Sequence, residues 1–206
     1  MFWLLENMMT FPASLRTIGL AGAIAAGSLG LAACTTTPST TSPTPTIPSN
    51  TRASVDTQVD AALNRLYNTV PGSRELVARS KGVLVFPAVV GGSFIVGGEY
   101  GRGALRVDGK TLDYYSTTAA SIGLQAGAQS KAVYYVFTTQ EALDKFRASK
   151  GWTAGIDATV AVAQIGANGT VDTQTLQQPV VAFVLNNAGL EAGVSLQGAK
   201  ISKIAL

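Results

Sequence analysis

Residues 89–107 of the 206-residue chain read VVGGSFIVGGEYGRGALRV, a segment in which six glycines and three charged residues interrupt apolar and aromatic side chains. The segment contains neither of the glycine spacings that form phosphate-binding loops. Its charges at Glu99, Arg102 and Arg106 interrupt any run that is long enough to span a bilayer. We therefore expect extended structure over 93–107, as one long strand or as two strands joined at 101–103.

The glycines of this segment need a physical reason, because glycine weakens a strand unless a bend, a bulge or a close neighbour requires the space. Two interpretations are open for Gly97, Gly98, Gly101 and Gly103. Either they allow the curvature of a tightly coiled sheet, or they form a shallow surface for the apolar part of a ligand.

Short apolar or alternating runs between turn residues indicate further strands. Asp108-Gly109 has the sequence of a two-residue hairpin turn, and Pro87 is expected to end the first apolar run. The expected strands are 83–86, 93–107, 112–116, 121–128, 132–138, 154–165, 180–186 and 190–196.

Two helices are expected before these strands. Apolar residues recur at helical spacing over 55–70, and Pro71-Gly72 ends that run. Ser73 is expected to cap a shorter helix over 74–80.

A third helix is expected between the strands, where Thr138 and Glu141 have the spacing of a capping box. Leu143 and Phe146 lie on the face of this helix that is expected to meet the core. The fold class is therefore α+β: an antiparallel sheet or flattened barrel, with N-terminal helices and one inserted helix packed on it.

The residue types that the chain lacks exclude several kinds of site. It has no histidine and a single cysteine, Cys34, so neither a Ser-His-Asp nor a Cys-His arrangement can form. The ligands of a typical zinc site are missing too, and no calcium-loop pattern occurs. The net charge of +3 is too diffuse to indicate a nucleic-acid surface. We expect no enzyme activity, no metal and no cofactor.

The N-terminal residues have the organisation of an export signal. Arg16 precedes a short apolar run over 17–33, which is shorter than a membrane-spanning helix needs to be. The sequence LAAC at 31–34 resembles a bacterial lipobox, in which the cysteine becomes the acylated first residue of the mature protein. The alternative is a soluble exported protein in which Cys34 is incidental.

These features predict three regions. Residues 1–33 form a lipoprotein-type signal peptide, and 34–53 form a Thr/Ser/Pro-rich tether with too little apolar surface to fold. Residues 54–206 form the folded domain. The membrane is then a partner through acylated Cys34, and the protein is expected in the bacterial cell envelope, on the outer membrane and facing the periplasm.

Four blocks of the domain resemble one known family. They are SKGVLVFP at 80–87, GGEYGRGAL at 97–105, YYSTTAASIGLQAGAQSKAVYYVF at 114–137 and ALDKFRASKGWTAGIDATVAV at 142–162. In this order they are similar to the SYLF domain, a lipid-binding module that is also labelled an actin-binding domain. The resemblance covers nearly all of 54–204 and implies phosphoinositide binding in eukaryotic members. For an exported bacterial protein it implies an anionic lipid or amphipathic ligand, and not actin.

Five cations are candidates for binding a lipid head group: Arg74, Arg79, Lys81, Arg102 and Arg106. Three of them precede the first strand and two lie on the glycine-rich segment. An arginine side chain suits phosphate because its planar fork can donate two parallel hydrogen bonds. The alternative is a solvated charged face without a ligand.

Other prominent residues are given structural interpretations. Asp157 is expected to be a strand-end or hydrogen-bonded carboxylate and not a catalytic acid. Trp152 is either a core residue where the third helix ends or an anchor at a membrane interface, and we expect the first. The pairs 114–115 and 134–135 are consecutive tyrosines, so each pair puts one ring on either face of the sheet, and half of the rings are expected to be exposed.

Two functions follow from these observations. The first is an envelope lipoprotein whose domain binds lipid or an anionic, amphipathic ligand. The second is a non-catalytic interaction protein that binds another envelope protein. The sequence alone does not separate them.

Overall fold

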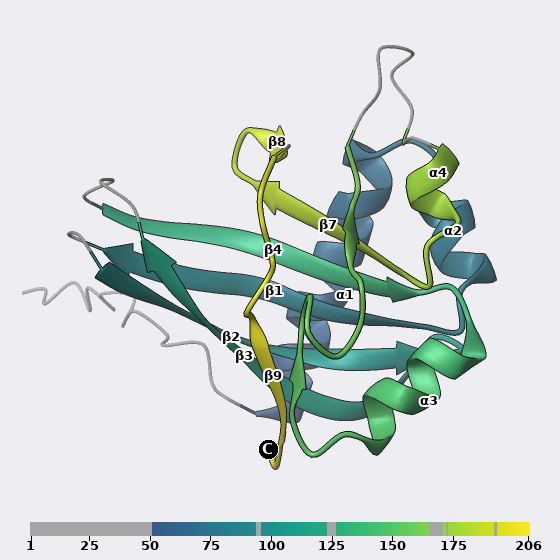
Figure 1. Ribbon diagram of the computed structural model, residues 1–206, viewed down its shortest axis with the longest axis horizontal. Coiled ribbons are helices and arrows are strands. Elements are labelled where there is room, and N and C mark those ends of the chain that lie inside the picture. Colours follow the sequence, from purple (N-terminus) through teal and green to yellow (C-terminus); the bar gives the residue numbers. More distant parts are fainter. Residues whose placement is uncertain (1–50, 94–95, 123–126, 165–170, 172, 192) are drawn as a thin grey trace, which may run out of the picture. The chain divides into compact units, whose positions relative to one another are not determined.

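The computed structural model describes residues 51–206, apart from 94–95, 123–126, 165–170, 172 and 192 (Figure 1). The predicted signal peptide and most of the predicted tether lie outside the described residues. The helices are α1 (Arg52–Thr69), α2 (Ser73–Arg79), α3 (Gln140–Ala148) and α4 (Thr173–Leu176). The strands are β1 (Gly82–Ser93), β2 (Val96–Val107), β3 (Lys110–Ile122), β4 (Gly127–Phe137), β5 (Trp152–Thr153), β6 (Ala161–Val162), β7 (Val180–Asn186), β8 (Gly189–Leu190) and β9 (Lys200–Ile204).

These strands form one curled sheet in the order β5-β9-β3-β2-β1-β4-β7-β6, with β8 paired to β7 (Figure 1). The pairs are antiparallel except for β6 and β7. The helix α3 is inserted between β4 and β5. The α+β prediction is therefore confirmed, and the sheet is a curled open sheet.

One face of the sheet, here called the α1 face, is covered by α1 and α2, and in Figure 1 α1 passes behind the long strands. Its core contains buried residues of α1 together with every second residue of the central strands. Members of this core are Val59, Leu66, Val85, Tyr134 and Phe183.

The opposite face, here called the α3 face, is covered by α3 and by the chain around 194–201. Phe146 of α3, Tyr135 of β4 and Trp152 of β5 meet there, with the Trp152 ring 5.6 Å from the Phe146 ring and 5.8 Å from the Tyr135 ring. Trp152 is 1% exposed, which confirms that it fills the core.

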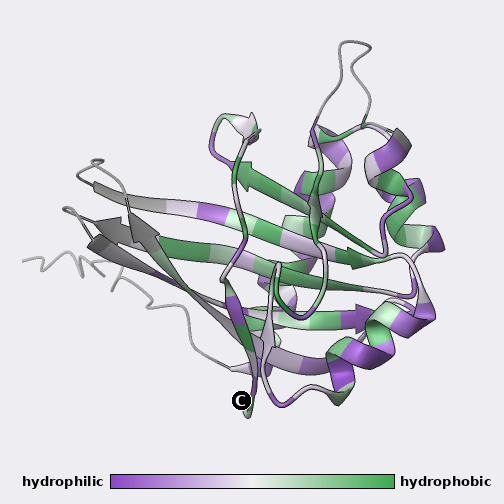
Figure 2. Cartoon of the chain, in the orientation of Figure 1, coloured by the Kyte–Doolittle hydropathy of each residue, from purple (hydrophilic) through white to green (hydrophobic). Residues whose placement is uncertain are grey.

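Burial on both faces explains why several strands read as continuous apolar runs. The strand β7, VVAFVLN, is buried over six of its seven residues and is coloured hydrophobic along most of its length in Figure 2. The helix α3 instead alternates between polar and apolar colours, since its buried residues, Leu143 and Phe146, lie on one side of it.

The predicted helices are present, but two of their caps differ. Ser73 does not cap α2; its hydroxyl donates to the carbonyl oxygens of Val70 and Leu66 at 2.6 and 3.2 Å, so it joins the end of α1 to the start of α2. The cap of α3 is Thr139 and not Thr138, because the hydroxyl of Thr139 accepts from the backbone N–H of Ala142 at 3.3 Å.

The first strand was predicted too short. β1 continues through Pro87 to Ser93, and the register with both neighbouring strands shifts between Val85 and Val89. Pro87 lies in this bulge, where its missing N–H breaks no regular ladder bond. The segment 89–107 is therefore the end of β1 followed by β2, and β2 runs unbroken through 101–103.

The Asp108-Gly109 turn is confirmed, and both residues have the positive φ that this turn needs, 49° and 74°. Of the predicted strand 121–128, residues 121–122 belong to β3 and 127–128 to β4, and the residues between them lie outside the described part of the chain. Among the described residues of 154–165 and 190–196, only 161–162 and 190 belong to strands. The helix α4 and the strand β9 were not predicted.

The tyrosine pairs alternate between the faces as expected: Tyr114 and Tyr134 belong to the α1 face, Tyr115 and Tyr135 to the α3 face. Half of the rings were expected to be exposed, and this is wrong because both faces are covered. Burial raises the pKa of Tyr115 and of Tyr134 to about 12, so both hydroxyls stay neutral at physiological pH.

Two glycines of β2 are explained by the bulge in β1. A Cβ atom on Gly103 would lie 1.9 Å from the carbonyl oxygen of Val85 and 2.8 Å from the ring of Phe86. A Cβ atom on Gly101 would lie 2.9 Å from the side chain of Val89. At these positions the glycines allow the close approach of β1, so the curvature interpretation applies to them and the ligand-surface interpretation does not.

The described helices offer no membrane-spanning segment, since none is both long and apolar enough to cross a bilayer.

This close approach predicts the effect of Gly103→Ala. The new methyl group would overlap a backbone carbonyl that cannot rotate away, so we expect a loss of about 3 kcal/mol, at the upper end of overpacking costs. In thermal unfolding followed by circular dichroism, this corresponds to a fall in Tm of about 6–12 °C.

Gly98→Ala is the matched control. Its Cβ would meet nothing nearer than the Ala119 carbonyl oxygen at 4.0 Å, so its Tm should change little. Equal Tm values for the two variants would contradict the explanation given for Gly103.

Candidate functional site

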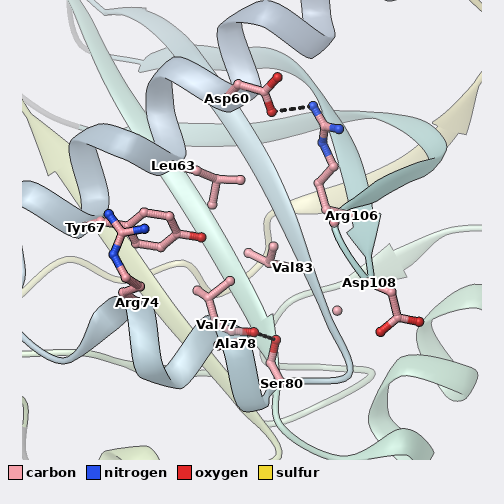
Figure 3. Close-up of a pocket in the computed structure, with 12 residues that line it drawn as sticks. Asp60, Leu63, Tyr67, Arg74, Val77, Ala78, Ser80, Val83, Arg106 and Asp108 are labelled. Carbon is pink, nitrogen blue, oxygen red and sulfur yellow. Dashed lines mark hydrogen bonds and ion pairs between the residues drawn. The ribbon is translucent and has the colours of Figure 1, made fainter.

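A pocket with a volume of about 400 Å³ lies between α1, α2 and the β1–β2 pair on the α1 face (Figure 3). It is here called the α1–α2 pocket. Figure 3 shows Arg74 and Arg106 on opposite sides of it, with Leu63, Val77 and Val83 between them. The pocket therefore combines two cationic ends with an apolar middle.

Arg74 lies at the α2 side of the pocket. Its guanidinium carbon is 4.4 Å from the centre of the Tyr67 ring, so the cation rests on the aromatic face. Burial raises the pKa of Tyr67, and the positive charge of Arg74 partly opposes this rise. Arg74 is exposed and forms no ion pair within the described residues, so its donors face solvent.

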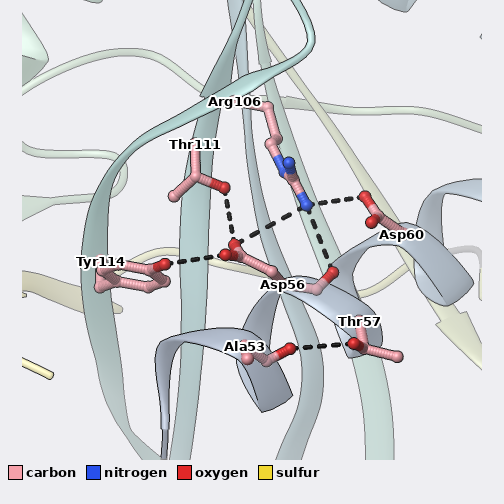
Figure 4. Close-up of polar contacts among 7 residues, drawn as sticks. All are labelled: Ala53, Asp56, Thr57, Asp60, Arg106, Thr111 and Tyr114. Atoms are coloured by element: carbon pink, nitrogen blue, oxygen red, sulfur yellow. Dashed lines mark hydrogen bonds and ion pairs between the residues drawn. The ribbon is translucent and has the colours of Figure 1, made fainter.

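Arg106 at the other side of the pocket is held by α1 (Figure 4). Its Nη2 donates to a carboxylate oxygen of Asp60 at 2.7 Å and to the backbone carbonyl oxygen of Asp56 at 3.2 Å. The side chain is only 13% exposed, and its buried Nε–H has no acceptor within the described part of the chain. Arg106 therefore has a structural role before any ligand arrives.

Asp56 is the centre of this network. It accepts hydrogen bonds from Thr111 at 2.6 Å and from Tyr114 at 2.9 Å, and its carboxylate lies 3.7 Å from Arg106 (Figure 4). Burial raises the pKa of Tyr114, and the hydrogen bond to Asp56 raises it further. The network fastens the first half of α1 to β2 and β3, and so fixes one wall of the pocket.

The five cations predicted as one site are distributed over three places. Arg74 and Arg106 line the α1–α2 pocket. Arg79 and Lys81 are exposed beside it, at the end of α2 and before β1, and neither pairs with a carboxylate among the described residues. These two cations and Arg74 are here called the α2 cations.

Arg102 lies elsewhere on the same face. Its Nε donates to the Tyr100 hydroxyl at 2.7 Å, and it lines a separate groove with Val55, Pro87 and Val90. Arg102 and Arg106 share the α1 face, as their even spacing predicts, but they do not act on one pocket.

The pocket lining also contains two acids. Asp60 is paired with Arg106, and Asp108 is exposed at the β2–β3 turn. The formal charges of the lining therefore balance. The additional positive charges, Arg79 and Lys81, lie outside the lining, at the α2 side. Sequence reasoning missed Asp60, Leu63 and Tyr67 as pocket residues, although their spacing already assigned the last two to the buried side of α1.

Within the described residues, no three acidic, histidine or cysteine side chains gather closely enough to hold a metal ion. Asp157 accepts a hydrogen bond from the backbone N–H of Thr153 at 2.6 Å, which confirms the prediction of a hydrogen-bonded carboxylate.

Comparison with known proteins adds one match. Residues 118–204 match the model of the family described as "Ysc84: Las17-binding protein actin regulator". No curated protein matches the chain. The matched residues run from the middle of β3 to the end of β9, so they exclude the lining of the α1–α2 pocket.

Proposed function

We propose that this chain, which belongs through residues 118–204 to the Ysc84 family of SYLF domains, binds an anionic amphipathic ligand such as a lipid in the α1–α2 pocket. No catalytic role is proposed. The family description names Las17 binding and actin regulation. Lipid binding comes from the resemblance to the SYLF domain, and it is the activity that suits the export proposed below.

The observation that carries this proposal is the position of Arg74. The guanidinium lies on the Tyr67 ring at one side of a pocket whose middle is formed by Leu63, Val77 and Val83. A negatively charged head group would bind the free donors of Arg74, and the adjoining apolar part of the ligand would cover the three aliphatic side chains. Arginine is suited to the first contact because it can bind two phosphate oxygens at once.

Arg79 and Lys81 would strengthen this interaction without lining the pocket. Each cation close to an anionic bilayer contributes about 1 kcal/mol, and the contribution falls off within a Debye length. The α2 cations would therefore direct the pocket towards a negatively charged surface and make binding weaker as salt rises.

We also propose that acylation of Cys34 holds the domain in the bacterial cell envelope, on the outer membrane facing the periplasm. The support is the sequence LAAC at 31–34, followed by a Thr/Ser/Pro-rich tether. More than one acyl chain is needed for stable anchoring, and a lipobox cysteine provides for this.

The binding proposal predicts that residues 35–206 co-sediment with vesicles that contain an anionic phospholipid, and less so with neutral vesicles or at high salt. Arg74→Glu combined with Lys81→Glu should weaken partitioning by at least about 30-fold, from the loss of two contributions of about 1 kcal/mol. Because the fragment 35–206 lacks Cys34, an acyl anchor cannot contribute to the binding that is measured.

Lys145→Glu combined with Lys150→Glu is the matched control. It makes the same change in charge at exposed positions of α3 and just after it, on the opposite face. Equal losses in both double variants would indicate a general charge effect. Equal co-sedimentation with anionic and neutral vesicles would favour the alternative, an interaction protein that recognises another envelope protein.

The anchoring proposal predicts that radiolabelled palmitate is incorporated into the full chain in a bacterial host and not into Cys34→Ser. Equal labelling of both, or of neither, would remove the lipoprotein assignment.

A further inference from the structure

A second hollow lies on the α3 face, separated from the α1–α2 pocket by the sheet. Its volume is about 330 Å³, and it lies between the strands β1–β4 and the chain at 194–199. It is here called the β-sheet groove. Its polar lining includes Glu99, Thr117, Lys131 and Tyr135.

An ion pair forms part of the wall of this groove. Lys131 of β4 donates to a carboxylate oxygen of Glu99 of β2 at 2.9 Å, and the two side chains are 18% and 22% exposed. The strands β2 and β4 flank β1, so the pair has to pass over β1. It does so at Gly91, where a Cβ atom would lie 3.0 Å from Cγ of Glu99.

This ion pair leaves much of its hydrogen-bonding capacity unused. The ammonium group of Lys131 has three donors and the carboxylate of Glu99 has two oxygens, whereas one bond joins them. Both side chains stay partly exposed, so their remaining donors and acceptors face the groove. The ion pair can therefore bind a ligand that forms hydrogen bonds to both Lys131 and Glu99.

Tyr135 provides an independent observation. Its side chain is only 1% exposed and lines the groove, yet its hydroxyl has no hydrogen-bond partner within the described residues. Burial raises the pKa of Tyr135, and the charge of Glu99 raises it further, so the hydroxyl is a neutral donor. The hydroxyl is not among the fully buried polar atoms that lack a partner, so it opens to the groove, where a ligand can accept a hydrogen bond from it.

The charge balance selects the kind of ligand. An anion alone would meet Glu99 and a cation alone would meet Lys131, so a ligand with a single charge would face repulsion from one member of the pair. A zwitterion satisfies both: its ammonium group bonds to Glu99, and its carboxylate bonds to Lys131 and to the Tyr135 hydroxyl.

We infer that the β-sheet groove binds a small zwitterion with one ammonium and one carboxylate group, of the size of an amino acid or a dipeptide. The volume of the groove is at the lower end of the range for small-molecule sites, which suits such a ligand. This site is separate from the lipid function proposed above, because the two lie on opposite faces of the sheet.

The test is titration calorimetry of the full chain in a nonionic detergent with alanyl-alanine as the probe. Saturable binding in the millimolar range or tighter is expected. The capped dipeptide N-acetyl-alanyl-alanine amide, which has the same backbone without the two charges, should give no saturable signal.

Two variants localise the binding. Lys131→Met should weaken it by about tenfold or more, because a hydrogen bond to a charged group is lost. Tyr135→Phe, which deletes a single oxygen atom, should weaken it less. Tyr100→Phe is the matched control for Tyr135→Phe, since Tyr100 is exposed on the α1 face, and it should leave binding unchanged.

Two outcomes on the wild-type chain would overturn the inference without relying on any variant. One is the absence of saturable binding of alanyl-alanine at millimolar concentration to protein whose circular dichroism shows it to be folded. The other is equal binding of the free and the capped dipeptide.

Discussion

The close contact between the bulge in β1 and the glycines of β2 is the constraint on which the rest of the domain depends. The carbonyl oxygen of Val85 occupies the position that a side chain at Gly103 would need, and the ring of Phe86 lies against the same glycine. A bulge of this kind increases the local twist of the strands that carry it. Because β1 is the central strand of the curled sheet, this contact lies between the two cores and helps to set the curvature of both.

The two faces of this sheet differ in how polar groups are arranged on them. On the α1 face, Asp56 joins α1 to β2 and β3, so Arg106 is paired before any ligand binds and Arg74 remains available. On the α3 face, Glu99 and Lys131 pair with each other above a glycine of β1. The first face has an excess of positive charge beside apolar side chains, and the second has balanced charge in a small groove. Different ligands are expected for the two faces on this physical basis.

Local sequence patterns correctly predicted the features that depend on neighbouring residues in the chain. Helical spacing predicted α1, the Asp108-Gly109 pair predicted the β2–β3 turn, and alternation placed the consecutive tyrosines on opposite faces. The continuation of β1 through Pro87 was not predictable in this way, since it depends on register shifts against two neighbours. The strand β9 contains two lysines in five residues, so its sequence does not indicate a buried strand. It is extended because it pairs with the edge of β3.

The candidate sites depend on contacts that are distant in sequence, so they were predicted less well than the fold. The even spacing of Arg102 and Arg106 correctly put both on one face, but the partner of Arg106 is Asp60 in α1, 46 positions away. Glu99 and Lys131 are 32 positions apart and gave no local signal. Arg74 was chosen from its charge alone, and its position over Tyr67 became apparent only when α2 was packed against α1.

The central claim is that an anionic amphipathic molecule binds beside Arg74 in the α1–α2 pocket. It is tested most directly by nuclear magnetic resonance of the arginine Nε–H groups of residues 35–206 during titration with dihexanoyl phosphatidylglycerol as dispersed monomers. We predict a saturable shift of the Arg74 signal while the Arg102 signal stays in place. A shift of the Arg102 signal without one at Arg74, or equal shifts of all arginine signals, would contradict the account.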